Sequence, residues 1–441
     1  MNRYSLRKRK RVAYGGADQK KNAKQPKPSP IVEQNTSTTS LTDVNNDCLE
    51  RIFLHLSVED LLSLAHSNKR LKEAAELAFD RNFGGKKSKV FVDSSCFRIE
   101  LIGKSPRRIE LRNPYRLLRS FGHLIAKLVI HTRKVVPYVN QYCCESATEV
   151  TFFKMSKDDF TGMQKPFVNV EMVCIIFCIL NSKTMQLNTR FPKMRTLKLI
   201  RVEAQAKCIK ANFAYLEHLE IKGALPTSRT QDTVNMLRLN PQLQQLVLDT
   251  NYTTTFLRAA SQDLQMLEHL DIRICRKDFS DYGDDVANFA QLKVLKIDYE
   301  GRSPTKVPMF SSCLKEFEWT FFGTQMDKAF IDFLKEHPSI VKLKVICWYP
   351  GIPKLNEESV KKIMEAVPLV EEITFQKLEL SIASATQLMN DCKSLKKMYF
   401  AMDAEANFNE LKTNLSDGWQ AFSENPDEFY WYNVTAVKMS N

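Results

Sequence analysis

One hydrophobic pattern recurs between residues 121 and 402: an apolar residue, two variable residues, an apolar residue, one variable residue and a third apolar residue. The copies are Ile125/Leu128/Ile130, Ala147/Val150/Phe152, Met194/Leu197/Leu199, Leu216/Leu219/Ile221, Leu243/Leu246/Leu248, Leu267/Leu270/Ile272, Leu292/Leu295/Ile297, Leu314/Phe317/Trp319, Ile340/Leu343/Val345, Val370/Ile373/Phe375 and Leu395/Met398/Phe400. They start 22 to 30 residues apart, except for one interval of 47 that leaves room for a degenerate copy at Phe167/Val170/Met172. Alternation within each copy predicts a short strand, and the fixed period predicts about twelve repeated units.

Prolines support the phase of this repeat. Pro192, Pro241, Pro338 and Pro368 each stand two residues before the first apolar position of a copy. Proline ends a helix because it lacks an N–H group and disfavours helix in the residue before it. The segments ahead of Pro241, Pro338 and Pro368 carry apolar residues at helical spacing, so each unit is expected to contain a strand, a turn and a returning helix.

Over residues 121–402 the sequence resembles the leucine-rich-repeat family. The resemblance implies an α/β solenoid, a horseshoe in which parallel strands line one side and helices the other. A doubly wound parallel sheet is the competing fold, but its strands are wholly apolar and its units longer, whereas charges fill the alternate strand positions here. Residues 86–120 are expected to be a linker or an N-terminal cap, and residues 403–441 a C-terminal cap.

A compact helical segment precedes the repeats. In residues 44–71, Leu49, Ile52, Phe53 and Leu56 follow helical spacing and predict one apolar face. Ser57, with Asp60 three residues later, predicts the start of a second helix. This hairpin carries more apolar surface than its own length can bury, which indicates a docking module.

The same residues resemble the F-box, the motif that attaches substrate receptors of Skp-cullin-F-box ubiquitin ligases to a Skp-type adaptor. The family's Leu-Pro start reads Val44-Asn45 here, its Val-Cys pair reads Ser67-Asn68, and its closing Trp is Leu71. With an F-box at 41–85 and the repeats behind it, the whole chain resembles the F-box plus leucine-rich-repeat class. By this resemblance the adaptor is expected to contact Val44, Leu49, Ile52, Phe53, Leu56, Asp60, Leu61, Leu64 and Leu71.

The expected function is therefore that of a non-catalytic substrate-recognition subunit, whose partners are a Skp-type adaptor, a cullin scaffold and a protein substrate. Alternating strand positions face away from the core. The expected substrate contacts are Lys198, Glu220, Asp271, Lys296, Glu318 and Lys344, with Trp348 and Tyr349 after one strand. The signs of these charges alternate, which favours a mixed-charge protein or peptide over a phosphate backbone.

The net charge of +13 is concentrated at one end. Residues 1–30 carry +9, so the other 411 residues carry only +4. Residues 1–40 are too polar to bury a core, so a disordered tail is expected. A basic run in this tail resembles a nuclear-import signal: Arg7, Lys8, Arg9, Lys10 and Arg11. The protein is therefore expected in the nucleus, in the cytoplasm or in both. Two alternatives stay open: a nuclear scaffold whose F-box has decayed, and a chromatin- or RNA-associated protein that acts through the tail.

Other chemistry finds little support in the sequence. The eleven cysteines stand mostly alone among apolar residues and form no second ligand pair, so neither zinc nor disulfides are expected. There is no phosphate loop, HExxH or GxSxG motif. His218 and His269 are expected to be ordinary surface histidines rather than ligand contacts. The run Phe429 to Tyr432 is expected to cover the end of the repeats. No cofactor, metal or membrane contact is expected.

Overall fold

The computed structural model describes residues 41–85, 88–93, 97–101, 108–111, 114–181, 185–204, 206–223, 230–250, 253–275, 289–300, 307, 310–321, 328–348, 354–402, 405–415, 418–424 and 432–439. The chain forms two units, Met1–Val44 and Asn45–Asn441, which are treated separately below. The described residues of the first unit contain one short 3-10 helix, η1 (Leu41–Asp43). The predicted tail, the basic run 7–11, Tyr349 and residues 429–431 lie outside the described residues.

The second unit begins with three helices where the sequence predicted a hairpin of two. They are α1 (Asn46–Phe53), α2 (Val58–Ser67) and α3 (Lys69–Phe83). Ser57 starts α2 as predicted, because its hydroxyl accepts a hydrogen bond from the backbone N–H of Asp60 and donates one to the Asp60 carboxylate. Asn68 caps α3 in the same way by accepting from the N–H of Arg70.

Residues 88–124 join the helices to the sheet. They form β1 (Ser88–Val92), β2 (Phe97–Leu101), β3 (Arg108–Leu111), α4 (Pro114–Phe121) and η2 (Gly122–Leu124). Strand β1 pairs antiparallel with β2 and parallel with β4 (Lys127–Ile130), and β2 pairs antiparallel with β3. Because β1 aligns Val90 with Leu128 and Val92 with Ile130, it extends the parallel series by one strand ahead of the first predicted copy.

The parallel series then follows the order of the chain. After β1 and β4, its members are β5 (Glu149–Phe153), β6 (Met172–Ile176), β8 (Thr196–Ile200), β10 (His218–Lys222), β11 (Gln245–Asp249), β12 (His269–Cys275), β13 (Val294–Glu300), β14 (Glu316–Phe321), β15 (Lys342–Cys347), β17 (Glu372–Leu380) and β18 (Lys397–Met402). Adjacent strands align their second and third apolar positions, as Leu219 aligns with Leu246 and Ile221 with Leu248. The result is one large sheet with helices.

One predicted copy is wrong in its register. The sequence placed it at Phe167/Val170/Met172, but β6 aligns Val173 with Val150 and Ile175 with Phe152. The inward residues of this unit are therefore Val170, Val173 and Ile175. Phe167 is also buried and stacks on Phe191. It is apolar because it belongs to the core, although it lies outside the strand.

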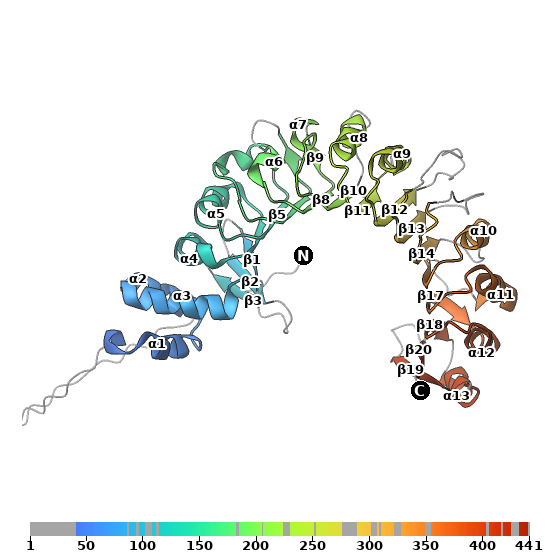
Figure 1. The fold of residues 1–441 in the computed structure, drawn as a ribbon. Helices are drawn as coiled ribbons and strands as arrows, with labels where there is room; N and C mark the ends of the chain where they lie inside the picture. Colours follow the sequence, from blue (N-terminus) through green and yellow to red (C-terminus); the bar gives the residue numbers. More distant parts are fainter. Residues whose placement is uncertain are drawn as a thin grey trace, which may run out of the picture. The chain divides into compact units, whose positions relative to one another are not determined.

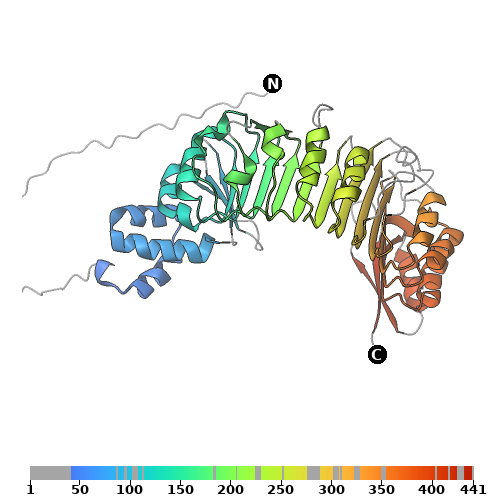
Figure 2. The same cartoon turned by 45° about the horizontal axis from the view of Figure 1, so that its top comes forward.

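Helices and short strands fill the intervals between the long strands. They are η3 (Arg133–Val135), α5 (Val136–Tyr142), η4 (Asp159–Gly162), β7 (Ile179–Leu180), α6 (Leu187–Arg190), β9 (Glu203–Ala204), α7 (Ala206–Ile209), α8 (Thr230–Arg238), α9 (Thr253–Asp263), α10 (Lys328–Glu336), β16 (Lys354–Leu355), α11 (Glu357–Ala366), α12 (Ile382–Asp391) and α13 (Glu405–Thr413). Helices α6, α8, α10 and α11 end just before Pro192, Pro241, Pro338 and Pro368, as predicted. Figures 1 and 2 show the helices α4 to α12 along one face of the sheet.

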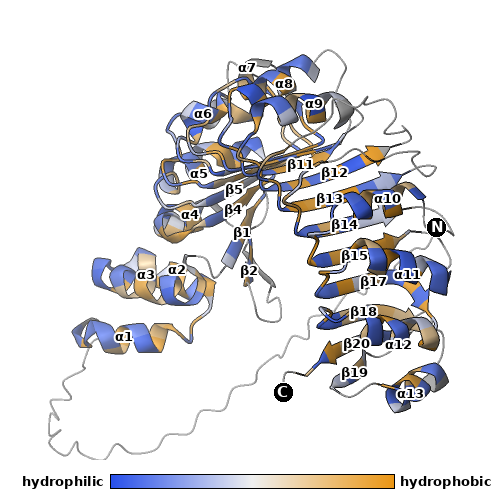
Figure 3. Ribbon diagram, turned by 45° about the vertical axis from the view of Figure 1, so that its right-hand side comes forward, coloured by the Kyte–Doolittle hydropathy of each residue, from blue (hydrophilic) through white to orange (hydrophobic). Residues whose placement is uncertain are grey.

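The core lies between the sheet and these helices. The apolar strand positions are nearly all buried, and the alternate positions are polar or half-exposed. Figure 3 shows this alternation of colour along strands such as β13 and β14. Trp319 is the largest fully buried side chain and contacts Tyr299, Phe317 and Phe330. The sheet surface opposite the helices is called the open face below.

Two antiparallel strands follow the parallel series at its C-terminal end. Strand β20 (Tyr432–Lys438) pairs with β18, and β19 (Trp419–Glu424) pairs with β20. Together with the antiparallel strands β2 and β3, they make the sheet mixed, an arrangement that the sequence did not predict. Val434 and Ala436 of β20 and Trp419 of β19 are buried.

The cysteines among the described residues are free thiols. Burial raises the pKa of Cys143 above its ordinary range and that of Cys178 to about 11. Both thiols are thus protonated near neutral pH and pack as small apolar groups. Within the described part of the chain, no helix has the length and apolar character needed to cross a membrane.

His337 couples the stability of the fold to pH. Its imidazole is buried, stacks on Phe333 and donates from Nδ1 to the Phe333 carbonyl. Burial lowers its pKa below the ordinary value of 6.5. The unfolded chain therefore binds the proton more readily, so this contribution to stability is present above pH 6.5 and is lost as pH falls towards the folded pKa.

Replacing His337 with Gln is expected to reduce the loss of stability on acidification. Urea midpoints measured at about pH 7.5 and about pH 5.5 should differ less in H337Q than in the unchanged protein. His131 and His269 also have lowered pKa values, chiefly through burial, so some acid sensitivity should persist. An identical shift of the midpoint in both proteins would contradict the role given to His337.

Candidate functional site

The predicted adaptor contacts divide into buried and exposed side chains. Leu49, Phe53, Leu61 and Leu71 lie in the interior of the α1–α3 bundle, whereas Ile52 is 49% exposed. Leu56 and Leu64 are half-buried and Asp60 is exposed. Val44, which belongs to the first unit, is half-buried.

Burial separates the predicted adaptor contacts into two groups. Leu49, Phe53, Leu61 and Leu71 have little or no exposed surface and form the core of the bundle, and contact of any of these residues with an adaptor stays a prediction. Leu49 and Phe53 point inward because α3 covers that face of α1, while Ile52 points outward. The sequence placed all of these residues on one apolar face because it gave no information on where α3 packs.

Polar contacts join α1 to α3. Arg81 of α3 forms an ion pair with Glu50 of α1 at 3.1 Å, and Asn82 donates to the carbonyl of Leu54 at 2.9 Å. The Arg70 guanidinium donates to the side chain of Asn46 at 3.1 Å. These bonds hold α1 on α3 and so keep Ile52 on the surface.

Helix α3 also shares a core with the start of the sheet. Phe79 of α3 stacks on Phe121 of α4 with ring centroids 4.4 Å apart, and both rings are fully buried. Glu76 of α3 approaches His123 of η2 at 3.7 Å. This buried aromatic contact packs the helical bundle directly against α4, the helix that precedes β4.

The predicted substrate residues form one row on the open face. Cross-strand register aligns Lys198 with Glu220, Asp271 with Lys296, and Lys296 with Glu318, which in turn aligns with Lys344. Val247 fills the place between Glu220 and Asp271. The sequence pattern thus placed these side chains on adjacent strands correctly, although their contact with a substrate stays a prediction.

Charges within this row largely neutralise one another. Glu220 pairs with Lys198 at 2.9 Å and Lys222 at 2.8 Å, and Glu318 lies 3.4 Å from Lys344. Burial opposes the charge on Glu220, but hydrogen bonds from the two lysines outweigh it and lower the pKa of Glu220. The carboxylate is therefore ionised at neutral pH and serves to hold two lysines side by side.

A second charged cluster, which the sequence did not single out, centres on Arg273 of β12. Its guanidinium lies 3.5 Å from Asp249, 3.5 Å from Asp298 and 2.9 Å from Glu300. Asp249, Arg273 and Asp298 sit two places further along their strands than the predicted row, and Glu300 sits four places further. An even number of places keeps a side chain on the same face of the sheet, so these residues also face outward. The sequence shows that these charged residues alternate with apolar ones along each strand. It does not show that three carboxylates surround Arg273, because that arrangement depends on how neighbouring strands align.

Trp348 and the two histidines are placed as follows. Trp348 is 51% exposed, and the Lys377 ammonium lies 4.5 Å from its ring centroid. His218 and His269 are half-buried on the open face rather than fully exposed. His218 hydrogen-bonds Gln245 at 2.6 Å, and burial lowers the pKa of His269.

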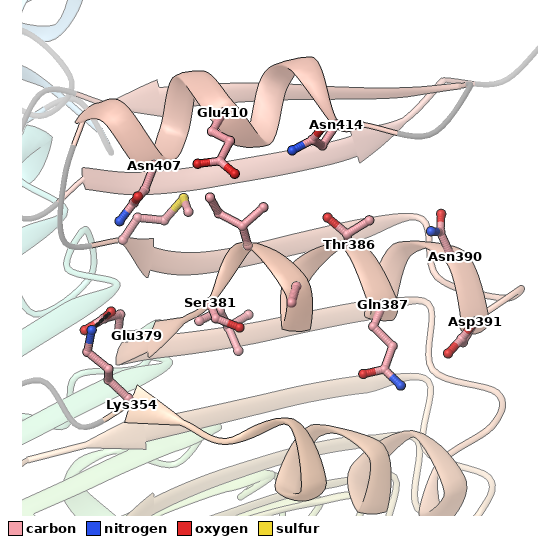
Figure 4. Close-up of a pocket in the computed structure, with 14 residues that line it drawn as sticks. Lys354, Glu379, Ser381, Thr386, Gln387, Asn390, Asp391, Asn407, Glu410 and Asn414 are labelled. Atoms are coloured by element: carbon pink, nitrogen blue, oxygen red, sulfur yellow. Dashed lines mark ion pairs between the residues drawn. The ribbon is translucent and has the colours of Figure 1, made fainter.

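A cavity of about 820 Å³, lined by both polar and apolar side chains, lies near the C-terminal end beside α12 and α13 (Figure 4). Glu379 lines it, is nearly buried and pairs with Lys354 at 2.6 Å. Thr386, Asn407 and Glu410 line it as well. None of the residues predicted as a site from sequence contributes to this cavity, because its lining comes from strand ends and helix positions near the C-terminus that carry no motif.

No group of His, Cys, Asp and Glu within the described ranges could hold a metal ion. The described site residues thus comprise an exposed apolar position on α1 and a broad open face of charged and aromatic side chains.

Comparison with known families identifies the N-terminal helices. Residues 41–77 match the family model of the F-box domain, which spans η1, α1, α2 and the first part of α3. No curated protein matches the chain. F-box domains typically bind Skp-type adaptors, and the proteins that carry them are generally non-catalytic adaptor subunits. The prediction of an F-box in this part of the chain is confirmed.

Proposed function

We propose that this protein is a substrate-recognition subunit of a Skp-cullin-F-box-type ubiquitin ligase. The observation that carries the proposal is the F-box match at residues 41–77, which precedes in the chain a long, mainly parallel sheet whose open face is covered by none of the described helices. The F-box would dock the adaptor, and the sheet would hold a protein substrate. The chain would supply proximity and orientation to a conjugating enzyme carried elsewhere in the complex, with no chemistry of its own.

We interpret the parallel series as a leucine-rich-repeat solenoid. Each strand follows the one before it in sequence, the register repeats the same apolar positions, and a returning segment separates successive strands. An architecture of this kind presents an extended surface along the strands. The open face therefore suits a partner with an extended or irregular contact surface.

Adaptor docking would centre on Ile52. An aliphatic side chain that is half-exposed on a short helix, beside the half-buried Leu56, supports a role as an anchor that becomes buried on binding. Full burial of one such side chain contributes about 1.5–3 kcal/mol. The buried residues of the F-box would act indirectly by holding Ile52 in place.

Affinity purification in the presence of a proteasome inhibitor tests the proposed function as a whole. The tagged full chain should retain a Skp-type adaptor and a cullin, and ubiquitinated proteins should accumulate with it. A matched I52D chain should retain those proteins through the sheet while losing the adaptor and the cullin. Retention of partners by the full chain without adaptor or cullin would instead support a scaffold whose F-box no longer docks.

A further inference from the structure

Aromatic rings cross the ends of four neighbouring strands on the open face. Phe91 of β1 lies 6.3 Å from His131, His131 lies 5.0 Å from Phe153 of β5, and Phe153 lies 6.0 Å from Phe177 after β6, measured between ring centroids. The first three rings are half-buried, and Phe177 is 43% exposed. These four residues are called the aromatic strip.

Cations cover the aromatic strip along its length. The Arg98 guanidinium lies 4.1 Å from the ring centroid of Phe91, the Lys154 ammonium 5.2 Å from that of Phe153, and the Arg201 guanidinium 5.4 Å from that of Phe177. Arg98 is also paired with Glu100 at 3.0 Å. Lys154 and Arg201 form no ion pair with any carboxylate of the described residues.

The backbone beneath the strip adopts a rare conformation. Lys154, Phe177 and Arg201 follow β5, β6 and β8 with φ values of 54°, 54° and 50°. Each donates its backbone N–H to the next strand, to the carbonyls of Ile176, Ile200 and Lys222 respectively. The equivalent residue after β10 is Gly223, with φ of 102°.

Glycine suits this position because side chains with a Cβ rarely adopt left-handed backbone. The chain nevertheless keeps a lysine, a phenylalanine and an arginine in three successive units. Strained positions of this kind are maintained where the side chain serves a purpose other than folding. Here the three side chains project beside one another and build the cationic and aromatic edge of the open face.

The rest of the open face has a different electrostatic character. There the charges pair with one another, as Glu318 does with Lys344 and Arg273 does with Glu300. A partner of either sign would have to displace those pairs. At the aromatic strip, by contrast, Lys154 and Arg201 present positive charge that a partner can neutralise without displacing a carboxylate of any residue that the structure describes.

We propose that the aromatic strip docks an anionic peptide segment of the substrate, in which acidic or phosphorylated side chains flank an aromatic or aliphatic one. The anionic groups would bind Lys154 and Arg201, since a guanidinium stacked on a ring keeps its in-plane N–H groups free for carboxylate or phosphate. The apolar side chain would pack against the exposed part of Phe177, which the Arg201 guanidinium leaves uncovered. This proposal rests on the proposed function and names the substrate class of its binding face.

Single-stranded nucleic acid is the competing partner for any surface of rings and cations. It needs free ring faces for base stacking. In the aromatic strip the cations approach the ring faces, and Phe153 and Phe177 meet edge to face at 83°. The geometry therefore favours a peptide.

Peptide selection with the purified full chain tests the proposal. A random-peptide phage library should yield sequences in which Asp or Glu stands next to an aromatic or aliphatic residue. Arrayed copies with phosphoserine in place of the acids then show which anion binds better. The double variant K154E/R201E and the variant F177G should each weaken the best peptide at least about tenfold, equivalent to about 1.4 kcal/mol. The exposed lysine variant K393E should bind as the unchanged chain does.

The variant F177G should keep an unchanged thermal midpoint, because glycine fits the left-handed backbone at this position. Selected peptides without acidic residues, no selected peptides at all, or undiminished binding by both strip variants would overturn the proposal. So would tighter binding of a labelled single-stranded RNA that the same variants abolish. None of these assays uses the F-box, so their failure leaves adaptor docking standing, and a failure of adaptor docking leaves them unaffected.

Discussion

Changing Ile52 to Asp is expected to abolish co-purification of a Skp-type adaptor while the protein stays folded. Ile52 is 49% exposed, so the substitution removes an apolar contact without opening a cavity. Loss of its burial removes about 1.5–3 kcal/mol, and an unpaired carboxylate in the interface adds a desolvation cost. The combined effect should exceed about 100-fold in affinity.

A matched control for this substitution is Leu369→Asp, because Leu369 is 56% exposed in the turn after α11. Its variant should retain the adaptor fully. Circular dichroism should give the same thermal midpoint for I52D, L369D and the unchanged chain. Adaptor retention by I52D, or its equal loss in L369D, would show that Ile52 is not the anchor.

The largest expected effect on stability is that of Trp319→Ala. Trp319 is 1% exposed and contacts Tyr299, Phe317 and Phe330 in the centre of the β13–β14 core. Truncating a buried aromatic side chain removes its transfer free energy and leaves a cavity, which together cost about 3–5 kcal/mol. The free energy of unfolding in urea, followed by far-ultraviolet circular dichroism, should fall by that amount.

Trp348→Ala serves as the matched control, since Trp348 is 51% exposed and contacts the Lys377 ammonium. Its loss should cost less than about 1 kcal/mol, the value of an exposed cation–π contact. An equal loss of unfolding free energy in the two variants would contradict the assignment of the strand faces, because Trp348 would then have to be as buried as Trp319.

Most of the sheet was predictable because a single physical signal repeats. Leu219, Leu246 and Leu270 occupy equivalent inward places, and alternation with polar residues marks their strands. The register around β6 was missed because buried residues outside the strand, such as Phe167, mimic the pattern. Strands β19 and β20 were missed because the antiparallel pairing of β20 with β18 and of β19 with β20 follows no sequence repeat.

The candidate site was predictable only in part. The row from Lys198 to Lys344 followed from alternation alone. The distinction between Ile52 and Phe53 did not, because it depends on where α3 packs. The aromatic strip combines residues from separate strands whose side chains meet only through register, and Phe177 reaches the surface through a left-handed backbone that its sequence neighbours do not signal.

Direct titration of the purified full chain with a purified Skp-type adaptor tests the central claim, that this F-box docks an adaptor. Isothermal calorimetry should show one adaptor bound per chain, with binding lost in I52D and kept in L369D. Absence of binding by the unchanged chain, or equal binding by I52D, would contradict the claim and leave the protein as a partner-holding scaffold.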